Sequence, residues 1–258
     1  MKNIIWTEWL KVRTYRTFWV MLLLAVIIPV AANFFMANLF SNGDLKKATQ
    51  LMGQPFSFPD IWLSVASISS YTSGLFAILL IILTTNEYTF RTNRQNIIDG
   101  WDRREFVYAK LFWLVALSVL ALVVSTLTGI IVGLSYGDTS VSFEDYRYIV
   151  YYFLQVLVAL AIALLIAVLL KRAGIAIVIF LAYSMMIDNV VSALLTRRFG
   201  RIGGLLPLQA GDELLPVPLF GKMISKEVYE PYVYFIAVLA YICLAVYVVF
   251  RKMMKSDL

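Results

Sequence analysis

The sequence predicts an all-α, polytopic membrane protein with six transmembrane helices. Two observations support this fold class. The chain of 258 residues is 61% hydrophobic with a mean hydropathy of +0.82, far above the values of a soluble domain. Its apolar residues also gather in six runs, each of about 20 residues or more, which is the length that a helix needs to cross the hydrocarbon core.

Residues 1–17 are predicted to form an amphipathic helix that lies in the membrane interface. One side of the helical wheel is apolar, with Ile5, Trp6, Trp9, Leu10 and Val12, and the other is polar, with Thr7, Glu8, Lys11 and Thr14. This division is typical of an interfacial helix whose polar side faces water. A signal peptide is disfavoured, because the charged lead is too long and contains two tryptophans.

Residues 18–258 are predicted to form one membrane domain with six spans. The six spans are expected at 18–40, 60–85, 107–136, 149–170, 174–195 and 232–250. Residues 196–231 contain glycines and prolines that interrupt the apolar pattern, so they are too broken to span. We expect an extracellular segment with short interfacial or re-entrant pieces there.

Polar residues inside the spans are candidates for a transport pathway. Ser64, Ser67 and Ser70 begin the second span and are candidate lining residues, although hydrogen bonding between helices is the commoner use of such serines. Asp188 and Asn189 lie toward the outer end of the fifth span and are candidate outer-gate residues, because an acid at membrane depth is costly. The alternative for Asp188 is a structural ion pair with Arg197 or Arg198.

The distribution of positive charge predicts that both termini lie in the cytoplasm. In that topology 14 of the 22 lysines and arginines lie on the cytoplasmic side and eight lie outside. Cytoplasmic loops carry the excess of Lys and Arg in membrane proteins. Five of the eight outer charges fall within 196–231, which is therefore the weakest part of the predicted topology.

The sequence also excludes several function classes. It has no histidine and one cysteine, Cys243, which removes histidine-based catalytic triads, structural zinc clusters and internal disulfides. The nearest approach to a phosphate-binding loop, at Gly221-Lys222-Met223, lacks the upstream glycine and the hydroxyl residue. We therefore expect no catalytic, cofactor-binding or metal-binding residues in this chain, no enzyme activity and no nucleic-acid partner.

The most polar stretch lies between the second and third spans, at residues 86–106. Residues 91–99 read as a short amphipathic helix, with Thr89 as a candidate N-cap and Gly100 as its stop. The simpler interpretation is a solvated loop whose basic residues only set the topology. The sharper interpretation is a docking helix that fits a groove on a soluble partner.

The pattern of this stretch resembles the segment after the second span of type-2 ABC exporter permeases. An acid, Glu87, ends the span, and Phe90-Arg91-Thr92, Arg94, Gly100, Arg103-Arg104 and Lys110 follow. Two departures are Arg91-Thr92 where the family often has Gly-Thr, and the lack of a proline near Gly100. In that family the segment is the cytoplasmic coupling helix, which contacts a separate ATPase subunit.

The resemblance implies a function, partners and a location. The chain would be the permease subunit of an ATP-driven exporter in the bacterial inner membrane, paired with a second permease chain and with soluble P-loop ATPases that bind ATP and magnesium. Glu87 would anchor the coupling segment to the bundle, and four further residues would belong to the ATPase interface: Arg91, Thr92, Arg94 and Arg104. The alternative is a membrane scaffold or sensor that docks a soluble partner on the same segment.

Overall fold

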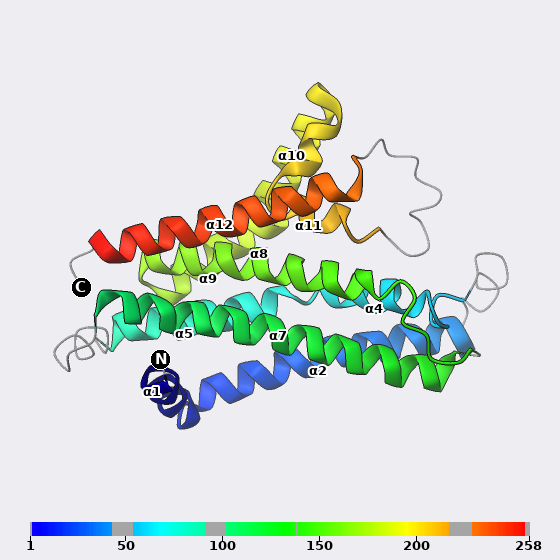
Figure 1. Cartoon of the computed structure of the whole chain (residues 1–258), viewed down its shortest axis with the longest axis horizontal. Helices are drawn as coiled ribbons and strands as arrows, with labels where there is room; N and C mark the ends of the chain where they lie inside the picture. Colours follow the sequence, from blue (N-terminus) through cyan, green and yellow to red (C-terminus); the bar gives the residue numbers. More distant parts are fainter. Residues whose placement is uncertain (1, 43–53, 91–101, 138, 217–228, 256–258) are drawn as a thin grey trace.

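The computed structural model describes residues 2–42, 54–90, 102–137, 139–216 and 229–255. These residues form helices and no β-strand, which confirms the all-α prediction (Figure 1). Five of the described helical segments are long and apolar enough to cross a membrane, and a bent pair of shorter helices makes a sixth. The chain is therefore a multi-pass membrane protein.

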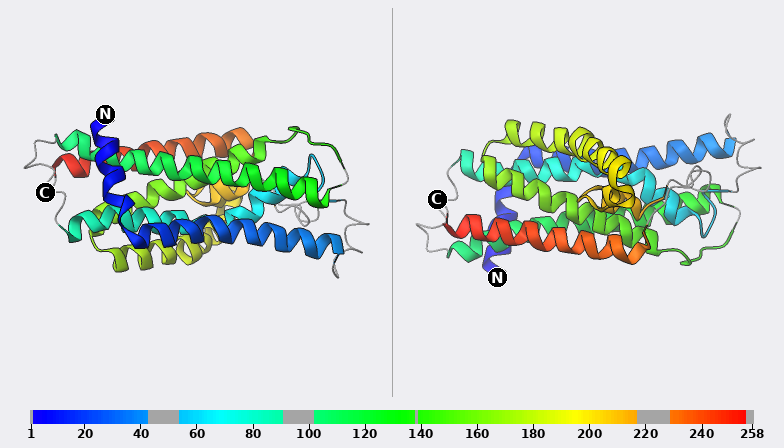
Figure 2. Two further views of the ribbon diagram at one scale, coloured as in Figure 1. Left: turned by 90° about the horizontal axis from the view of Figure 1, so that it is seen from below. Right: turned by 90° about the horizontal axis from the view of Figure 1, so that it is seen from above.

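Four of the predicted spans are continuous helices. They correspond to α2 (Arg16–Asn42), α7 (Arg103–Tyr136), α8 (Arg147–Leu170) and α12 (Pro231–Lys255). The N-terminal helix α1 (Lys2–Arg13) lies across the long helices of the bundle (Figure 2). A short break at Thr14-Tyr15 separates it from α2, so the interfacial helix and the first span are distinct elements.

The second span differs from the prediction of one continuous helix. It consists of α4 (Ile61–Ser70) and α5 (Gly74–Thr89), which meet at an angle of 45°. At the break, Ser70 and Ser73 donate hydrogen bonds to the carbonyls of Ser67 and Ser70 at 2.8 and 2.7 Å. Hydroxyl side chains that bond nearby backbone carbonyls weaken or bend a helix, so the serine-rich sequence accounts for the break.

The fifth span is also irregular. It begins as α9 (Ala173–Ala182), passes through a π-helical turn η1 (Tyr183–Ile187) and continues as α10 (Asp188–Phe199), which leans away from the bundle (Figure 1). A 3₁₀ turn η2 (Gly200–Leu205) and a short helix α11 (Gln209–Glu213) then bring the chain back against α8 and α12. Single π-helical turns are frequent at functional sites.

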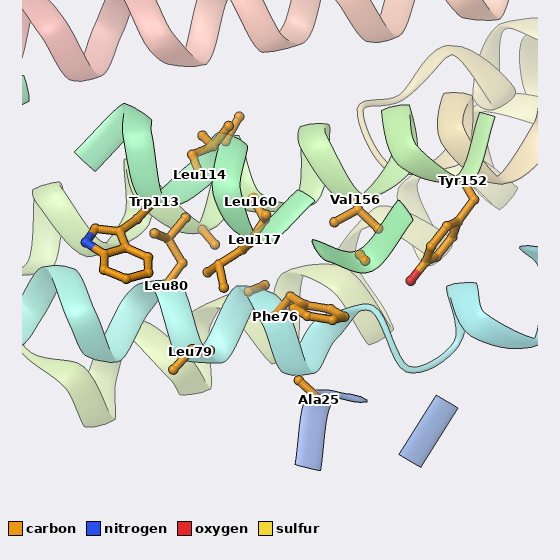
Figure 3. Close-up of a cluster of buried hydrophobic side chains, with 14 of the residues drawn as sticks. Ala25, Phe76, Leu79, Leu80, Trp113, Leu114, Leu117, Tyr152, Val156 and Leu160 are labelled. Atoms are coloured by element: carbon orange, nitrogen blue, oxygen red, sulfur yellow. The ribbon is translucent and has the colours of Figure 1, made fainter. Parts of the chain in front are cut away.

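Helix α8 is the centre of the bundle. It contacts α4, α5, α7, α9, α11 and α12, and 61% of the residues in its most apolar stretch are buried, against 17% for Ala173–Leu205. Its small residues Ala159, Ala163 and Ala167 are buried, so neighbouring helices approach closely. Figure 3 shows the apolar core that α8 shares with α5 and α7, including Leu80, Leu117 and Leu160.

Several helices also have an apolar face that points away from the core of the bundle and is exposed. On α7 the exposed residues recur at every fourth position, at Val115, Val119, Val123, Leu127 and Ile131. A stripe of this kind on the outside of a helical bundle is the surface that lipid or a second membrane subunit covers.

The segments that the charge distribution assigns to one side lie together at one end of the bundle. Lys110 at the start of α7 contacts Glu8 of α1, and Arg103 Nη1 donates to the carbonyl of Met254 near the end of α12 at 2.8 Å. At the turn after α8, Lys171 Nζ lies 5.3 Å from the centre of the Tyr88 ring of α5. Both terminal helices therefore reach the end at which α5 stops and α7 begins (Figure 1).

Candidate functional site

A buried ionic cluster lies at the root of segment 86–106. It consists of Glu8 and Lys11 of α1, Glu87 of α5 and Lys110 of α7, and we call these four residues the ionic cluster. Lys110 Nζ lies 2.8 Å from Glu87 Oε1 and 3.2 Å from Glu8 Oε2, while Lys11 Nζ lies 2.9 Å from Glu87 Oε1 and 2.6 Å from Glu8 Oε1. Each charge thus touches both charges of opposite sign.

Three of the four residues of the ionic cluster are almost completely removed from solvent, whereas the Lys11 side chain is 25% exposed. Lys110 is 1% exposed, Glu8 2% and Glu87 5%. Two acids and two bases give it no net charge, which a buried site requires because an unpaired ion is strongly destabilising in a low dielectric. Trp113 Nε1 donates to Glu8 Oε2 at 3.0 Å and adds a further bond to the cluster.

One carboxylate oxygen of the ionic cluster accepts no hydrogen bond from the described residues. Both lysines bind Glu87 Oε1, and Glu87 Oε2 is buried with no hydrogen-bond partner among the described residues. A buried carboxylate oxygen without a donor costs free energy. In the last turn of α5, Glu87 therefore keeps an acceptor that no described residue uses.

The electrostatics of Glu8 reflect both burial and its neighbours. Burial alone would raise the pKa of Glu8, but the charges of Lys110 and Lys11 and their hydrogen bonds outweigh it and hold the pKa at about 2, below the ordinary value of 4.5. Glu8 therefore stays ionised at neutral pH and contributes its full attraction to both lysines.

The lowered pKa predicts a specific acid sensitivity. Because the folded protein holds the Glu8 proton less tightly than the unfolded chain, this contribution to stability is complete above about pH 4.5 and is lost as the pH falls toward 2. We expect the thermal unfolding temperature of the purified chain to fall between pH 5 and pH 3, and to fall less in Glu8→Gln. The same pH dependence in both proteins would contradict the assignment.

The start of α7 is held by its own polar contacts. Asp102 and Glu105 form a capping box. The Asp102 side chain accepts a hydrogen bond from the Arg104 backbone N–H, and the Glu105 carboxylate accepts one from the Asp102 backbone N–H at 3.2 Å. Arg103 is bonded to the α12 backbone, as described above. The last residues of segment 86–106 are thereby attached to the C-terminal helix.

The predicted coupling residues fall into two groups. Glu87 lies in the ionic cluster and Arg104 is exposed on the first turn of α7. Arg91, Thr92 and Arg94 lie outside the described residues. Thr89 does not cap a following helix, as the sequence suggested, because it is the last residue of α5 and its hydroxyl donates to the Thr85 carbonyl at 3.1 Å.

Sequence reasoning missed three members of the ionic cluster and misplaced one face of α1. Glu8 and Lys11 were expected on the water side, yet Glu8 faces the bundle, while Trp6 and Leu10 are exposed. The signal was present in the sequence: Lys110 lies within the third span, where a charge requires a partner of opposite sign. An acid on the preceding interfacial helix is one of the few groups that can supply it.

Asp188 lies where the π-helical turn passes into α10 and is 2% exposed. Its carboxylate accepts hydrogen bonds from the Tyr183 hydroxyl at 3.0 Å and from the Gln209 backbone N–H at 3.1 Å. Within the described residues it forms no ion pair with Arg197 or Arg198. Asn189 Oδ1 accepts from Gln209 Nε2 at 2.9 Å, so both candidate gate residues connect the fifth span to α11.

The three candidate pathway serines separate in the structure. Ser67 and Ser70 line a cavity of about 520 Å³ beside the break between α4 and α5. Ser64 is buried, donates to the Pro55 carbonyl and does not line this cavity. Asn189 also lines it, so a candidate gate residue and two candidate lining residues share one space.

Comparison with known proteins identifies the family. The chain matches the model of the family described as ABC-2 family transporter protein over residues 4–189, which is well over half of its length. No curated protein matches the chain. The matched range contains the whole ionic cluster, both halves of the broken second span and the π-helical turn. The chain therefore belongs to the ABC-2 transporter family and is a membrane permease component of an ABC transporter.

Proposed function

We propose that this chain is the permease of an exporter that is driven by a separate ATPase docked on residues 86–106. The observation that carries the proposal is the ionic cluster, because it joins the helix before this segment, the helix after it and α1. A displacement of the segment would be transmitted to all three helices at once. Family membership also disfavours the alternative of a scaffold or sensor.

The roles of the individual residues follow from their positions. Glu87 and Lys110 connect the two flanking helices, and Glu8 and Lys11 attach the interfacial helix to them. Arg104 is exposed near the end of the segment, where it is available to an acidic surface. Arg91, Thr92 and Arg94 are proposed as direct contacts with the ATPase on the basis of the sequence pattern.

The proposed assembly contains two permease chains and two ATPase chains. ATP and magnesium would bind to the ATPases. Both termini would face the cytoplasm of a bacterial cell, at the end of the bundle that contains the ionic cluster. Asp188 and Asn189 are retained as proposed outer-gate residues, because they connect the π-helical turn to α11.

The proposed function is tested by reconstitution. Vesicles that contain only this chain should hydrolyse no ATP, and addition of the P-loop ATPase encoded beside it should produce hydrolysis that the permease modulates. Co-purification of the two proteins in detergent is the accompanying binding measurement. A neighbouring ATPase that neither co-purifies nor changes its rate in the presence of the permease would contradict the proposal.

The proposed orientation is tested by cysteine labelling. In a Cys243→Ser background, an impermeant thiol reagent on intact cells should label Ser41→Cys and leave Asn96→Cys unlabelled, because Ser41 lies in the last turn of α2 and Asn96 lies between the second and third spans. Permeabilised cells should show labelling of both. Labelling of Asn96→Cys alone on intact cells would reverse the proposed topology.

A further inference from the structure

The cavity of about 520 Å³ lies among the break of the second span, α8, the π-helical turn and α11. Its polar lining comes from four serine hydroxyls, two amides and one carboxylate: Ser67, Ser70, Ser73, Ser184, Gln155, Asn189 and Asp212. The Ser184 hydroxyl donates to the Leu181 carbonyl at 3.3 Å. Its volume is that of a small organic ligand and far exceeds a single ion. The hydrogen bonds of this lining decide which chemistry it accepts.

The hydroxyl protons at the helix break are already committed. Ser70 and Ser73 donate to backbone carbonyls one turn earlier, and Ser67 donates to the carbonyl of Pro216 at 3.4 Å. Backbone N–H groups at the start of α5 are committed too, because Leu75 and Phe76 donate to the carbonyls of Thr72 and Ser73. The serine oxygens therefore present lone pairs, which only accept hydrogen bonds.

The amide nitrogens of Asn189 and Gln155 also donate hydrogen bonds within the protein. Asn189 Nδ2 donates to the carbonyls of Ser184 and Met185, at 3.1 and 3.3 Å. Gln155 Nε2 donates to Asp212 Oδ1. This bond fixes the amide orientation of Gln155, because the flipped amide would place its oxygen against a carboxylate oxygen.

The side-chain oxygen of Gln155 is a separate observation that points to a ligand in the cavity. It is 6% exposed, it lines the cavity, and its Oε1 is buried without a hydrogen-bond partner among the described residues. The arrangement depends on Gly211, since a Cβ at that position would come within 2.9 Å of Gln155 Cγ. The close approach of α11 thus places the Asp212 carboxylate next to the Gln155 amide, whose oxygen has no donor among the described residues.

The charge of the lining agrees with its hydrogen bonding. None of the described lining residues is Lys or Arg, and Asp212 contributes a carboxylate. The hydroxyl of Tyr71 lies on a side chain that is 82% exposed, so it belongs to the rim. Phe180, Leu215 and Ala159 supply apolar walls. A carboxylate or phosphate ligand would meet acceptors and a negative charge.

We infer that this cavity binds the ammonium group of an amphipathic organic amine. An ammonium carries three donors, no acceptor and a positive charge, which is the complement of this acceptor-rich lining, while the apolar walls would hold the rest of the molecule. The cavity's use as a transport site rests on the proposed function, but its ligand chemistry does not, because binding requires neither ATP nor a partner.

The inference is tested by equilibrium binding to the full chain, without the ATPase, in nanodiscs of phosphatidylcholine. The probe is the fluorescent primary amine dansylcadaverine, followed by its emission. Its N-acetylated form keeps the shape without the charge and should bind at least about tenfold more weakly, since hydrogen bonds to charged groups are the stronger ones. Equal affinity for the two probes would overturn the inference.

Two variants and a matched control locate the binding site. Gln155→Leu and Asp212→Asn should each weaken dansylcadaverine binding by about tenfold. The control is Asn33→Leu, which removes another buried amide with an unpartnered oxygen that does not line the cavity, and it should bind as wild type. Wild-type affinity in both cavity variants, or an equal loss in the control, would refute the site.

A final arm distinguishes a free amine from a lipid headgroup with the same ammonium chemistry. Phosphatidylethanolamine in the nanodisc should compete with the probe if the natural ligand is a headgroup, and should not compete if it is a free amine. Loss of amine selectivity with intact ATPase coupling would reject the inference alone. Amine binding in a chain that couples to no ATPase would reject the proposed function alone.

Discussion

Glu87→Ala is expected to destabilise the bundle and abolish ATP-driven transport. Removing this carboxylate takes away one of the two acids that contact Lys110, whose side chain is 1% exposed. Breaking a buried ion pair from one side typically costs about 3–5 kcal/mol. The measurement is thermal unfolding of the purified chain, together with transport in vesicles that contain its ATPase.

The double variant Glu87→Leu with Lys110→Met separates stability from function. It removes one charge of each sign and leaves the Glu8–Lys11 pair at 2.6 Å, so the cluster stays neutral. Apolar replacement of a buried ion pair is often neutral or stabilising, and we expect the double variant to unfold near the wild-type temperature. Equal destabilisation of the single and double variants would show that the cluster's charge balance is not the cause.

Arg94→Glu is expected to release the ATPase from the permease and to stop transport while the bundle stays intact. Reversal of a charge that faces an acidic partner replaces attraction by repulsion, and losing a desolvated charge pair at an interface costs about 2–5 kcal/mol, or roughly 30-fold or more in affinity. The measurement is co-purification of the ATPase with tagged permease at fixed salt.

The matched control is Arg147→Glu. Arg147 begins α8, whose other end reaches the Lys171 turn near Tyr88, so it lies at the end of the bundle away from the ionic cluster. Its side chain pairs with Asp145 near the surface, at 2.7 Å. ATPase binding should be unaffected in this variant. Wild-type binding in Arg94→Glu would reduce the coupling segment to a loop that sets topology.

The span pattern could be predicted from the sequence, because long apolar runs with charged ends depend only on composition and length. The bend at Tyr71 was not predicted, although its cause is local: serines and a threonine that bond their own backbone carbonyls. Membrane serines more often bond to a neighbouring helix, and periodicity does not distinguish the two uses.

For the candidate site, the sequence indicated one residue but not the residues from other helices that contact it. Glu87 was singled out because it follows an apolar run and precedes a basic segment, both of which are local patterns. Its partners Lys11 and Lys110 come from other helices, and the face that α1 turns toward the bundle depends on packing. An amphipathic pattern alone assigns polar residues to water, whereas here the acid of α1 neutralises a lysine buried in α7.

The central claim is that the ionic cluster transmits motion of the ATPase to the bundle. The most direct test is the amount of substrate transported per ATP hydrolysed by reconstituted Glu87→Leu/Lys110→Met, which keeps the cluster neutral and the docking arginines unchanged. We predict that this variant still binds its ATPase and hydrolyses ATP, but that transport per ATP falls at least tenfold. A wild-type ratio of transport to hydrolysis would contradict the claim.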